Sequence, residues 1–230
     1  MNSKNLLVII TLIVVSFTFA SCKTPPDKIS SSNNTTVITE NFENVSIGAI
    51  PKGWKIENTN LKGELPEWKT IKDKSAPSGE KVLCLADTKK SSGSSFNLCW
   101  TKNIAFDNGT VEVDIKAVNG EEDQGGGVIW RAKDKNNYYV VRFNPLEDNF
   151  RIYYVKNGKR KKIKSANVKL PKNKWFNVKI VQNDNKYECY LNGKKLIEGC
   201  DDNIKGKGGV GIWTKADAAS LFDNFKAEQK

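Results

Sequence analysis

The stretch GIWTKADAASLFDNF, residues 211–225, gathers side chains that can do chemistry near the end of the chain. Lys215 and Asp217 lie at its polar corner, where an amine and a carboxylate could transfer a proton. The chain contains no histidine. This absence excludes histidine-based nucleophile systems, a histidine general base and histidine-ligated metals, so catalysis would use carboxylates, lysine, tyrosine or arginine. Lys215 and Asp217 are therefore the candidate catalytic residues.

A second chemical pattern is a possible carboxylate pair in VEVDIKAV. Strand alternation would place Glu112 and Asp114 on one face, about 7 Å apart, which suits paired carboxylates. A solvated strand face explains the same spacing, and no motif assigns acid and base roles to any pair of acids in the chain.

Aromatic residues recur beside arginine and asparagine in the middle and at the end of the chain. Sugar-binding sites combine such apolar platforms with a few fixed hydrogen-bond donors, because sugar rings have apolar faces and polar edges. The alternative is that the aromatic side chains cover sheet edges. The candidate binding residues are Trp130, Arg131, Tyr139, Arg142, Asn144, Arg151, Tyr153 and Trp213.

These candidates need strands to position them. After residue 36 no helical period is sustained, and short β-branched and aromatic runs alternate with period two between turns such as Asn157-Gly158 and Asn192-Gly193. Near-regular spacing of short strands predicts one all-β domain over residues 37–230, an antiparallel sandwich. The predicted strands are 36–42, 67–71, 82–86, 95–102, 110–118, 127–133, 138–144, 149–155, 160–164, 175–182, 186–191, 195–198, 209–215 and 221–227.

The first residues have the pattern of an export signal. Lys4 precedes an apolar run over residues 6–19, which is shorter than the roughly 20 residues that span a bilayer. The sequence FASC at 19–22 resembles a bacterial lipobox, in which Cys22 becomes the acylated first residue; an ordinary cleaved signal is the alternative. We expect a signal peptide over residues 1–21.

The segment that follows predicts a flexible tether. Residues 22–36 are rich in Pro, Ser, Asn and Thr and cannot bury a core. We therefore expect a protein anchored by lipid in the bacterial cell envelope. Lys23, where an aspartate would indicate inner-membrane retention, favours the outer membrane; the sequence indicates no protein partner.

The cysteines other than Cys22 predict disulfides. An exported chain meets oxidising conditions, and four cysteines are an even number. Proximity along the chain favours Cys84 with Cys99 and Cys189 with Cys200, although three pairings are possible. Zinc is the weaker interpretation, because the spacings are long and histidine is absent.

The chain is basic, with a formal net charge of +11. Residues 156–174 contain nine Lys or Arg and no acid. This segment could bind an acidic polysaccharide or anionic lipid headgroups, although a solvated hairpin explains it as well. We do not expect nucleic acid as a partner, because the segment lacks aromatic residues that would stack on bases.

Several of these stretches together resemble a known family. GGGVIWRAKDKNNYYVVRFNPLEDNFRIYYVKNGKRKKI, KWFNVKI, YLNGKKLIEGCDD and GGVGIWTKADAASLFDNF are similar to concanavalin A-like jelly-roll domains of the 3-keto-disaccharide hydrolase group, also described as laminin-G-like or glycoside-hydrolase-like. The resemblance implies two curved antiparallel sheets whose concave face receives carbohydrate. The Glu-x-Asp-x-x-Glu pattern of laminarinase-type jelly rolls is absent.

The resemblance also implies a metal. Jelly rolls of this type often bind calcium where the last strand lies beside the first. Alternation places Asp223 among core residues of the last strand, and the first strand offers Glu40 and Glu43. We expect either a calcium site formed by these acids or hydrogen bonds from backbone amides to Asp223.

Three functions remain open at this point. The first is binding of carbohydrate by an anchored envelope protein. The second is cleavage of a glycoside, including a 3-keto-disaccharide, with Asp217 or Lys215 as the base. The third is a structural or adhesive role for the basic hairpin.

Overall fold

A computed structural model describes residues 35–88 and 91–230. The predicted signal peptide, Cys22 and residues 22–34 of the predicted tether lie outside the described residues. Within the described ranges, no helix is long and apolar enough to cross a membrane.

The described residues form fifteen strands. They are β1 (Thr36–Glu40), β2 (Trp54–Thr59), β3 (Glu67–Lys72), β4 (Lys81–Asp87), β5 (Phe96–Phe106), β6 (Gly109–Asn119), β7 (Gly126–Asp134), β8 (Asn137–Asn144), β9 (Asn149–Lys156), β10 (Lys159–Asn167), β11 (Trp175–Asn183), β12 (Lys186–Leu191), β13 (Lys194–Cys200), β14 (Gly208–Lys215) and β15 (Ala219–Gln229).

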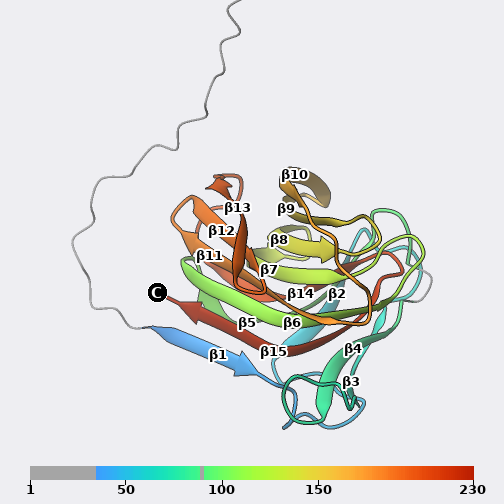
Figure 1. Cartoon of the computed structure of the whole chain (residues 1–230). Helices are drawn as coiled ribbons and strands as arrows, with labels where there is room; N and C mark the ends of the chain where they lie inside the picture. Colours follow the sequence, from blue (N-terminus) through green and yellow to red (C-terminus); the bar gives the residue numbers. More distant parts are fainter. Residues whose placement is uncertain (1–34, 89–90) are drawn as a thin grey trace, which may run out of the picture.

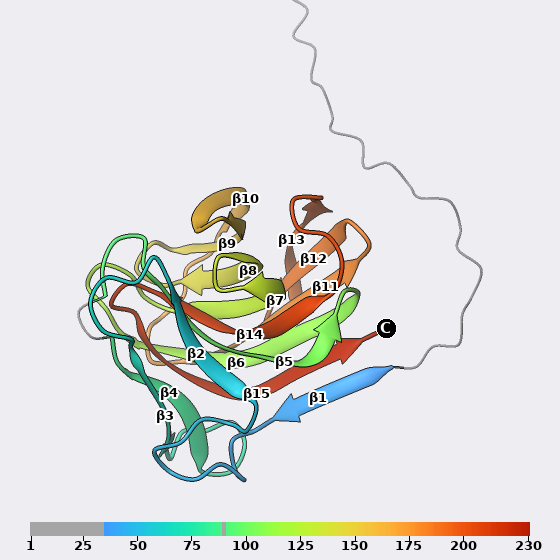
Figure 2. The ribbon, with the colours of Figure 1, turned by 180° about the vertical axis from the view of Figure 1, so that it is seen from behind.

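The strands form two antiparallel sheets that pack face to face (Figures 1 and 2). Sheet A has the order β13-β12-β11-β6-β15-β4-β3, and β1 also pairs with β15. Sheet B has the order β10-β9-β8-β7-β14-β5-β2. Strands from both halves of the chain are interleaved in each sheet, so the sandwich is closed by contacts between distant segments.

The core between the sheets follows from strand alternation. In β6, Val111, Val113 and Ile115 are fully buried and face inward. Val128 and Val141 of sheet B belong to the same cluster. Burying such side chains contributes roughly 1.5–3 kcal/mol each, and this drives the two sheets together.

Sheet B is curled so strongly that its two edges approach each other. Asn60 follows β2 at one edge, and its Nδ2 donates to the carbonyl of Gly158, in the turn between β9 and β10, at 2.8 Å. From the opposite edge, the guanidinium of Arg160 on β10 lies 5.0 Å from the ring centroid of Phe96 on β5. The outer face of sheet B is therefore concave.

The architecture confirms the predicted all-β sandwich of two antiparallel sheets. The prediction omitted β2, whose sequence WKIENT is short, polar at alternate positions and preceded by Pro51 and Gly53. Strand β2 forms an edge and pairs only with β5, so little of it must be apolar.

The predicted disulfide pairings are wrong, although Cys200 itself is disulfide-bonded. Cys84, Cys99 and Cys189 are free thiols, so neither Cys84–Cys99 nor Cys189–Cys200 forms. Cys84 lies on β4 of sheet A, whereas Cys99 lies on β5 of sheet B, and nearness in sequence did not bring them together. Cys99 and Cys189 are fully buried and act as small apolar side chains of the core.

Candidate functional site

Trp130 and Tyr139 lie in the core between the sheets and not on the concave face. Their rings stack with centroids 5.4 Å apart, and both belong to the inter-sheet cluster. The Nε1 of Trp130 donates to Gln182 at 2.8 Å, and the hydroxyl of Tyr139 donates to Asp201 at 2.5 Å. The prediction that these two aromatic residues line the binding surface is therefore wrong, because alternation in β7 and β8 turns them inward.

Arg131 is a structural residue at one end of β7. It adopts φ 48° at an irregularity in the pairing of β7 with β8. Its guanidinium donates to the carbonyls of Asp107 at 2.9 Å and Asp184 at 2.7 Å, and it forms an ion pair with Asp107. These contacts tie loops together, and Arg131 takes no part in the concave face.

The concave face has an apolar floor that is itself buried. Trp213 and Tyr153, two predicted binding residues, are only 1% and 4% exposed there. The Nε1 of Trp213 donates to the hydroxyl of Tyr138 at 3.2 Å. The prediction was that these rings stack on a sugar, but their burial leaves no free ring face for it. The floor comprises Phe96, Leu98, Trp100, Ile129, Ala132, Tyr138, Val140, Tyr153, Val155 and Trp213.

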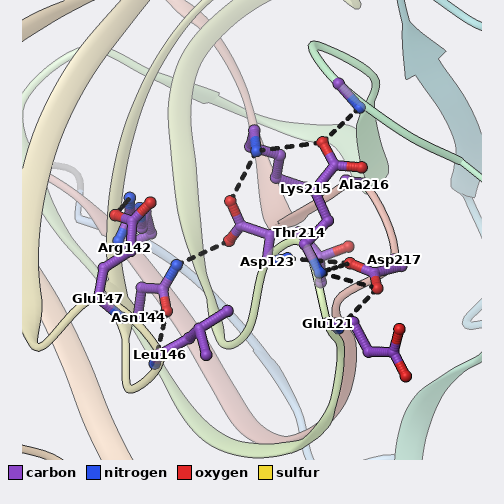
Figure 3. Close-up of polar contacts among 12 residues, drawn as sticks. Glu121, Asp123, Arg142, Asn144, Leu146, Glu147, Thr214, Lys215, Ala216 and Asp217 are labelled. Carbon is purple, nitrogen blue, oxygen red and sulfur yellow. Dashed lines mark hydrogen bonds and ion pairs between the residues drawn. The ribbon is translucent and has the colours of Figure 1, made fainter.

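One end of this face is polar (Figure 3). Asp123, from the loop between β6 and β7, accepts hydrogen bonds from Lys215 at 2.8 Å and from Asn144 at 3.0 Å. The Asp123 side chain is 3% exposed. Burial raises its pKa, and the positive charges of Arg142 and Lys215 only partly offset this effect. A buried carboxylate with a raised pKa is a candidate proton acceptor.

Arg142 lies next to this pair, and each of its two terminal nitrogens donates hydrogen bonds. Nη1 donates to Asn149 at 2.6 Å, and Nη2 donates to Glu147 at 3.0 Å and to Tyr153 at 3.2 Å. Arg151 reaches the same Oε2 of Glu147 at 2.9 Å. Burial alone would raise the pKa of Glu147, but hydrogen bonds from Asn149 and Arg142 outweigh it and lower the pKa to about 2.

The turn between β8 and β9 positions Glu147. The Oδ1 of Asn144 accepts hydrogen bonds from the amides of Leu146 at 2.8 Å and Glu147 at 3.1 Å. Asn and Asp commonly close turns in this way. Asp148 then adopts φ 50°, which brings the chain back into β9. The sequence NPLEDN thus directs a carboxylate towards Arg142 and Arg151.

We name Asp123, Arg142, Asn144, Glu147, Asn149, Arg151 and Lys215 the concave polar cluster. Four of these were predicted from the sequence: Arg142, Asn144, Arg151 and Lys215. Asp123, Glu147 and Asn149 were missed. Each lies in or at the end of a turn beside a strand that carries a predicted residue, and this position was the available signal. Glu147 (40% exposed) and Arg151 (28%) form the accessible rim.

Asp217 was predicted to be a catalytic base, but its carboxylate is occupied by backbone amides. Its carboxylate accepts hydrogen bonds from the amides of Glu121 at 2.7 Å, Glu122 at 3.1 Å and Asp123 at 2.9 Å. Burial alone would raise the pKa of Asp217, but these amides outweigh it and lower the pKa. Asp217 therefore fixes the loop that carries Asp123, and its catalytic role remains a prediction that the contacts do not favour.

The predicted calcium ligands each accept backbone hydrogen bonds. Asp223 accepts from the amides of Ser78 at 2.9 Å and Asn224 at 2.7 Å, Glu40 from that of Phe42, and Glu43 from those of Glu80 and Lys81. Among the described residues, no three acidic, cysteine or histidine side chains converge as metal ligands. The amide alternative for Asp223 is thus observed, and this donor set does not fit a three-carboxylate site. Calcium stays a prediction.

The Glu112–Asp114 strand face is also used structurally. Asp114 accepts hydrogen bonds from Asn177 at 3.0 Å and Asn224 at 2.9 Å. This carboxylate cross-links β6 with β11 and β15 on the outer face of sheet A, far from the concave polar cluster in the sandwich.

Solved structures support the jelly-roll fold. The carbohydrate-binding module CBM66 from Bacillus subtilis matches with a TM-score of 0.58 and 21% identity, covering 77% of this chain and 96% of that chain. A β-glucanase from Bacillus licheniformis matches with a TM-score of 0.54 and 12% identity, covering 84% and 98%. At these identities the likeness establishes the fold alone.

Sequence comparison adds a curated relative and a family. A levanase from Bacillus subtilis (strain 168) is 26% identical over 141 residues, which cover 60% of this chain. The chain spans only 20% of that protein's length. The model of the 3-keto-alpha-glucoside-1,2-lyase-like domain matches residues 48–227, which include β2 to β14 and most of β15. Because this match covers well over half of the sequence, the chain belongs to the family of 3-keto-alpha-glucoside-1,2-lyase-like domains.

Proposed function

We propose that the concave polar cluster binds carbohydrate. The observation that carries the proposal is the convergence of charged and amide side chains from β8, β9, β14 and two loops at one end of a curled sheet. Carboxylates and guanidinium groups hydrogen-bond to pairs of sugar hydroxyls, and their fixed geometry provides specificity. Glu147 and Arg151 are the rim residues that a sugar would meet first.

The similar proteins support this proposal. CBM66 is named as a carbohydrate-binding module, and the levanase and the β-glucanase are named for the glycans on which they act. Levan-type fructans and β-glucans are therefore the first neutral glycans to test. Because the aromatic floor is buried, recognition would depend on hydrogen bonds at the polar rim more than on ring stacking.

The test is a glycan array followed by calorimetry with the best ligand. We expect Arg151→Ala to weaken binding at least tenfold, since it removes a rim donor and one of the three side chains that donate to Oε2 of Glu147. Lys69→Ala is the matched control, because Lys69 is a partly exposed, ion-paired cation of sheet A. Equal affinity of wild type and Arg151→Ala, with unchanged unfolding midpoints, would contradict the location of the site.

A second candidate is elimination from a 3-keto-glycoside. The observation in its favour is Asp123, a buried carboxylate with a raised pKa next to Lys215. A keto group acidifies the adjacent C–H, so a single carboxylate could accept that proton while the C1–O bond breaks, the electron pair leaves with the oxygen and a carbon–carbon double bond forms. Lys215 could protonate the departing oxygen.

Product analysis after incubation with 3-keto-disaccharides tests this candidate. We expect Asp123→Asn to abolish an activity that wild type shows. Asp217→Ala distinguishes the two acids: if it removes activity while Asp123→Asn retains it, Asp217 is the base. Absence of product from the wild-type protein leaves carbohydrate binding as the function.

We also propose that a lipid on Cys22 anchors the protein in the outer membrane of the cell envelope. The support is the signal-like sequence over residues 1–21 and the lipobox-like FASC. Labelling of cells with an alkyne fatty acid should mark the wild-type protein and not Cys22→Ala. Equal labelling of both proteins would exclude this site.

A further inference from the structure

Arg160 of β10 extends across the aromatic floor of the concave face. Its guanidinium carbon lies 4.4 Å from the ring centroid of Tyr153, 5.0 Å from that of Phe96 and 5.8 Å from that of Trp213. Three rings from three strands therefore hold the cation by cation–π contacts. Such contacts fix a guanidinium but leave its N–H groups without acceptors.

Two buried donors on this face have no acceptor. Within the described part of the chain, the Nη1 of Arg160 and the Nε of Arg142 are buried without a hydrogen-bond partner. Arg142 is 1% exposed. Both guanidinium groups lie against the ring of Tyr153, at 4.4 and 5.7 Å from its centroid. Buried donors of this kind are rare, and each calls for an explanation such as a ligand.

The charges on this face are also unbalanced. Glu147 is shared by Arg142 and Arg151, and Asp123 is paired with Lys215. In residues 35–88 and 91–230, no carboxylate forms an ion pair with Arg160. The charge of Asp123 acts on Arg160 only through space. A largely desolvated cation without a contacting counter-charge is costly, so an anion from outside the chain would be favoured there.

We propose that Arg160 and Arg142 form a subsite for an oxyanion carried by a sugar. The class of ligand is an acidic glycan whose carboxylate or sulfate group accepts the free guanidinium N–H groups. Arginine suits this role, because its planar donors match oxyanions and its charge persists at all physiological pH values. The inference rests on the proposed function and specifies the charge of the sugar that the same site takes.

The experiment compares matched pairs of oligosaccharides by calorimetry. One arm uses a uronate-containing oligosaccharide and its carboxyl-reduced neutral form; the other uses a sulfated oligosaccharide and its desulfated form. We expect the anionic member to bind at least tenfold more tightly in one arm or both, and this advantage to shrink as salt is added. The arm with the larger ratio identifies the anion.

Two variants locate the effect. Arg160→Gln should remove the advantage of the anionic sugar and leave the affinity for the neutral form within twofold. Lys161→Gln is the control, because it makes the same charge change on the same strand; Lys161 pairs with Tyr154, on the opposite face from Tyr153. If Arg160→Gln folds poorly, Arg160→Lys replaces it in the test. This variant keeps the charge and should retain part of the advantage of the anionic sugar.

The outcomes separate the two proposals. Equal affinity of wild type for anionic and neutral sugars overturns the oxyanion subsite and leaves carbohydrate binding intact. A preference for anions that Arg160→Gln and Lys161→Gln reduce equally also overturns it, because the general basic charge would then be responsible. Failure of the wild-type protein to bind any glycan overturns both proposals.

Discussion

At the scale of single residues, the surroundings of a carboxylate decide what it can do. Asp217 accepts three backbone amides and has a lowered pKa, whereas Asp123 is buried beside Lys215 and has a raised pKa. Both belong to the same loop network, since Asp217 holds the amides around Asp123. The sequence pattern pointed to Asp217 and missed Asp123, because it does not distinguish an acid that organises a loop from an acid that faces the sheet.

Asp223 carries the clearest prediction of pH dependence. Burial is the main effect, and it raises the pKa of Asp223 from 3.8 to about 6. Hydrogen bonds from the amides of Ser78 and Asn224 oppose this rise, whereas the negative charges of Asp114 and Glu43 add to it. The folded state therefore binds this proton more tightly than the unfolded state. The contribution of Asp223 to the free energy of unfolding should fall as the pH rises from about 4 to about 6, and then become constant.

Carboxyl NMR titration of the folded protein should give a midpoint near pH 6 for Asp223. Urea unfolding at several pH values should show that the free energy of unfolding of wild type falls, relative to that of Asp223→Asn, as the pH rises from about 4 to about 6. An NMR midpoint near the ordinary aspartate value would show that the carboxylate is better solvated or better paired than the structure indicates.

At the scale of elements, glycines in sheet B allow the strands behind the polar cluster to approach closely. Gly127 of β7 pairs with Arg142 of β8. A Cβ at Gly127 would lie 1.8 Å from the carbonyl oxygen of Val141 and 2.8 Å from the Cα of Arg142. These neighbours are backbone atoms and cannot rotate away.

Gly127→Ala should therefore lower the free energy of unfolding by about 3 kcal/mol or more and weaken glycan binding, because Arg142 must move. Gly63→Ala is the comparison: it has φ +85° but open space around its Cβ, so about 1 kcal/mol of backbone strain is expected. Urea unfolding measures both. Similar losses for the two variants would mean that β7 and β8 adjust readily to a side chain.

Period-two alternation was sufficient to predict nearly every strand, since a half-buried strand must present one apolar face. It was insufficient for the site. In β7 and β14 both faces are buried, so alternation could not tell that Trp130 faces the core and Trp213 faces the concave side. Arg160 was hidden within a lysine-rich run, and its contacts with Phe96 and Trp213 depend on the curl of the sheet.

At the scale of the whole molecule, the sandwich is closed where β1 pairs with β15. The resemblance implies calcium in this region, and the acids involved are Asp223, Glu40 and Glu43. If calcium binds, it must replace amide hydrogen bonds at these carboxylates, and the midpoint of thermal unfolding should rise in millimolar calcium and fall with chelator. A midpoint unchanged by either addition would exclude a structural calcium.

The lysines of β10 have a consequence for how copies of the protein behave beside one another. This strand is an unpaired edge of sheet B, and Lys159, Lys161, Lys162 and Lys164 are all exposed along it. An exposed edge can add a strand from another molecule and begin aggregation, whereas a row of like charges makes such an addition repulsive. The same basic hairpin that delivers Arg160 to the concave face thus keeps neighbouring copies from joining their sheets.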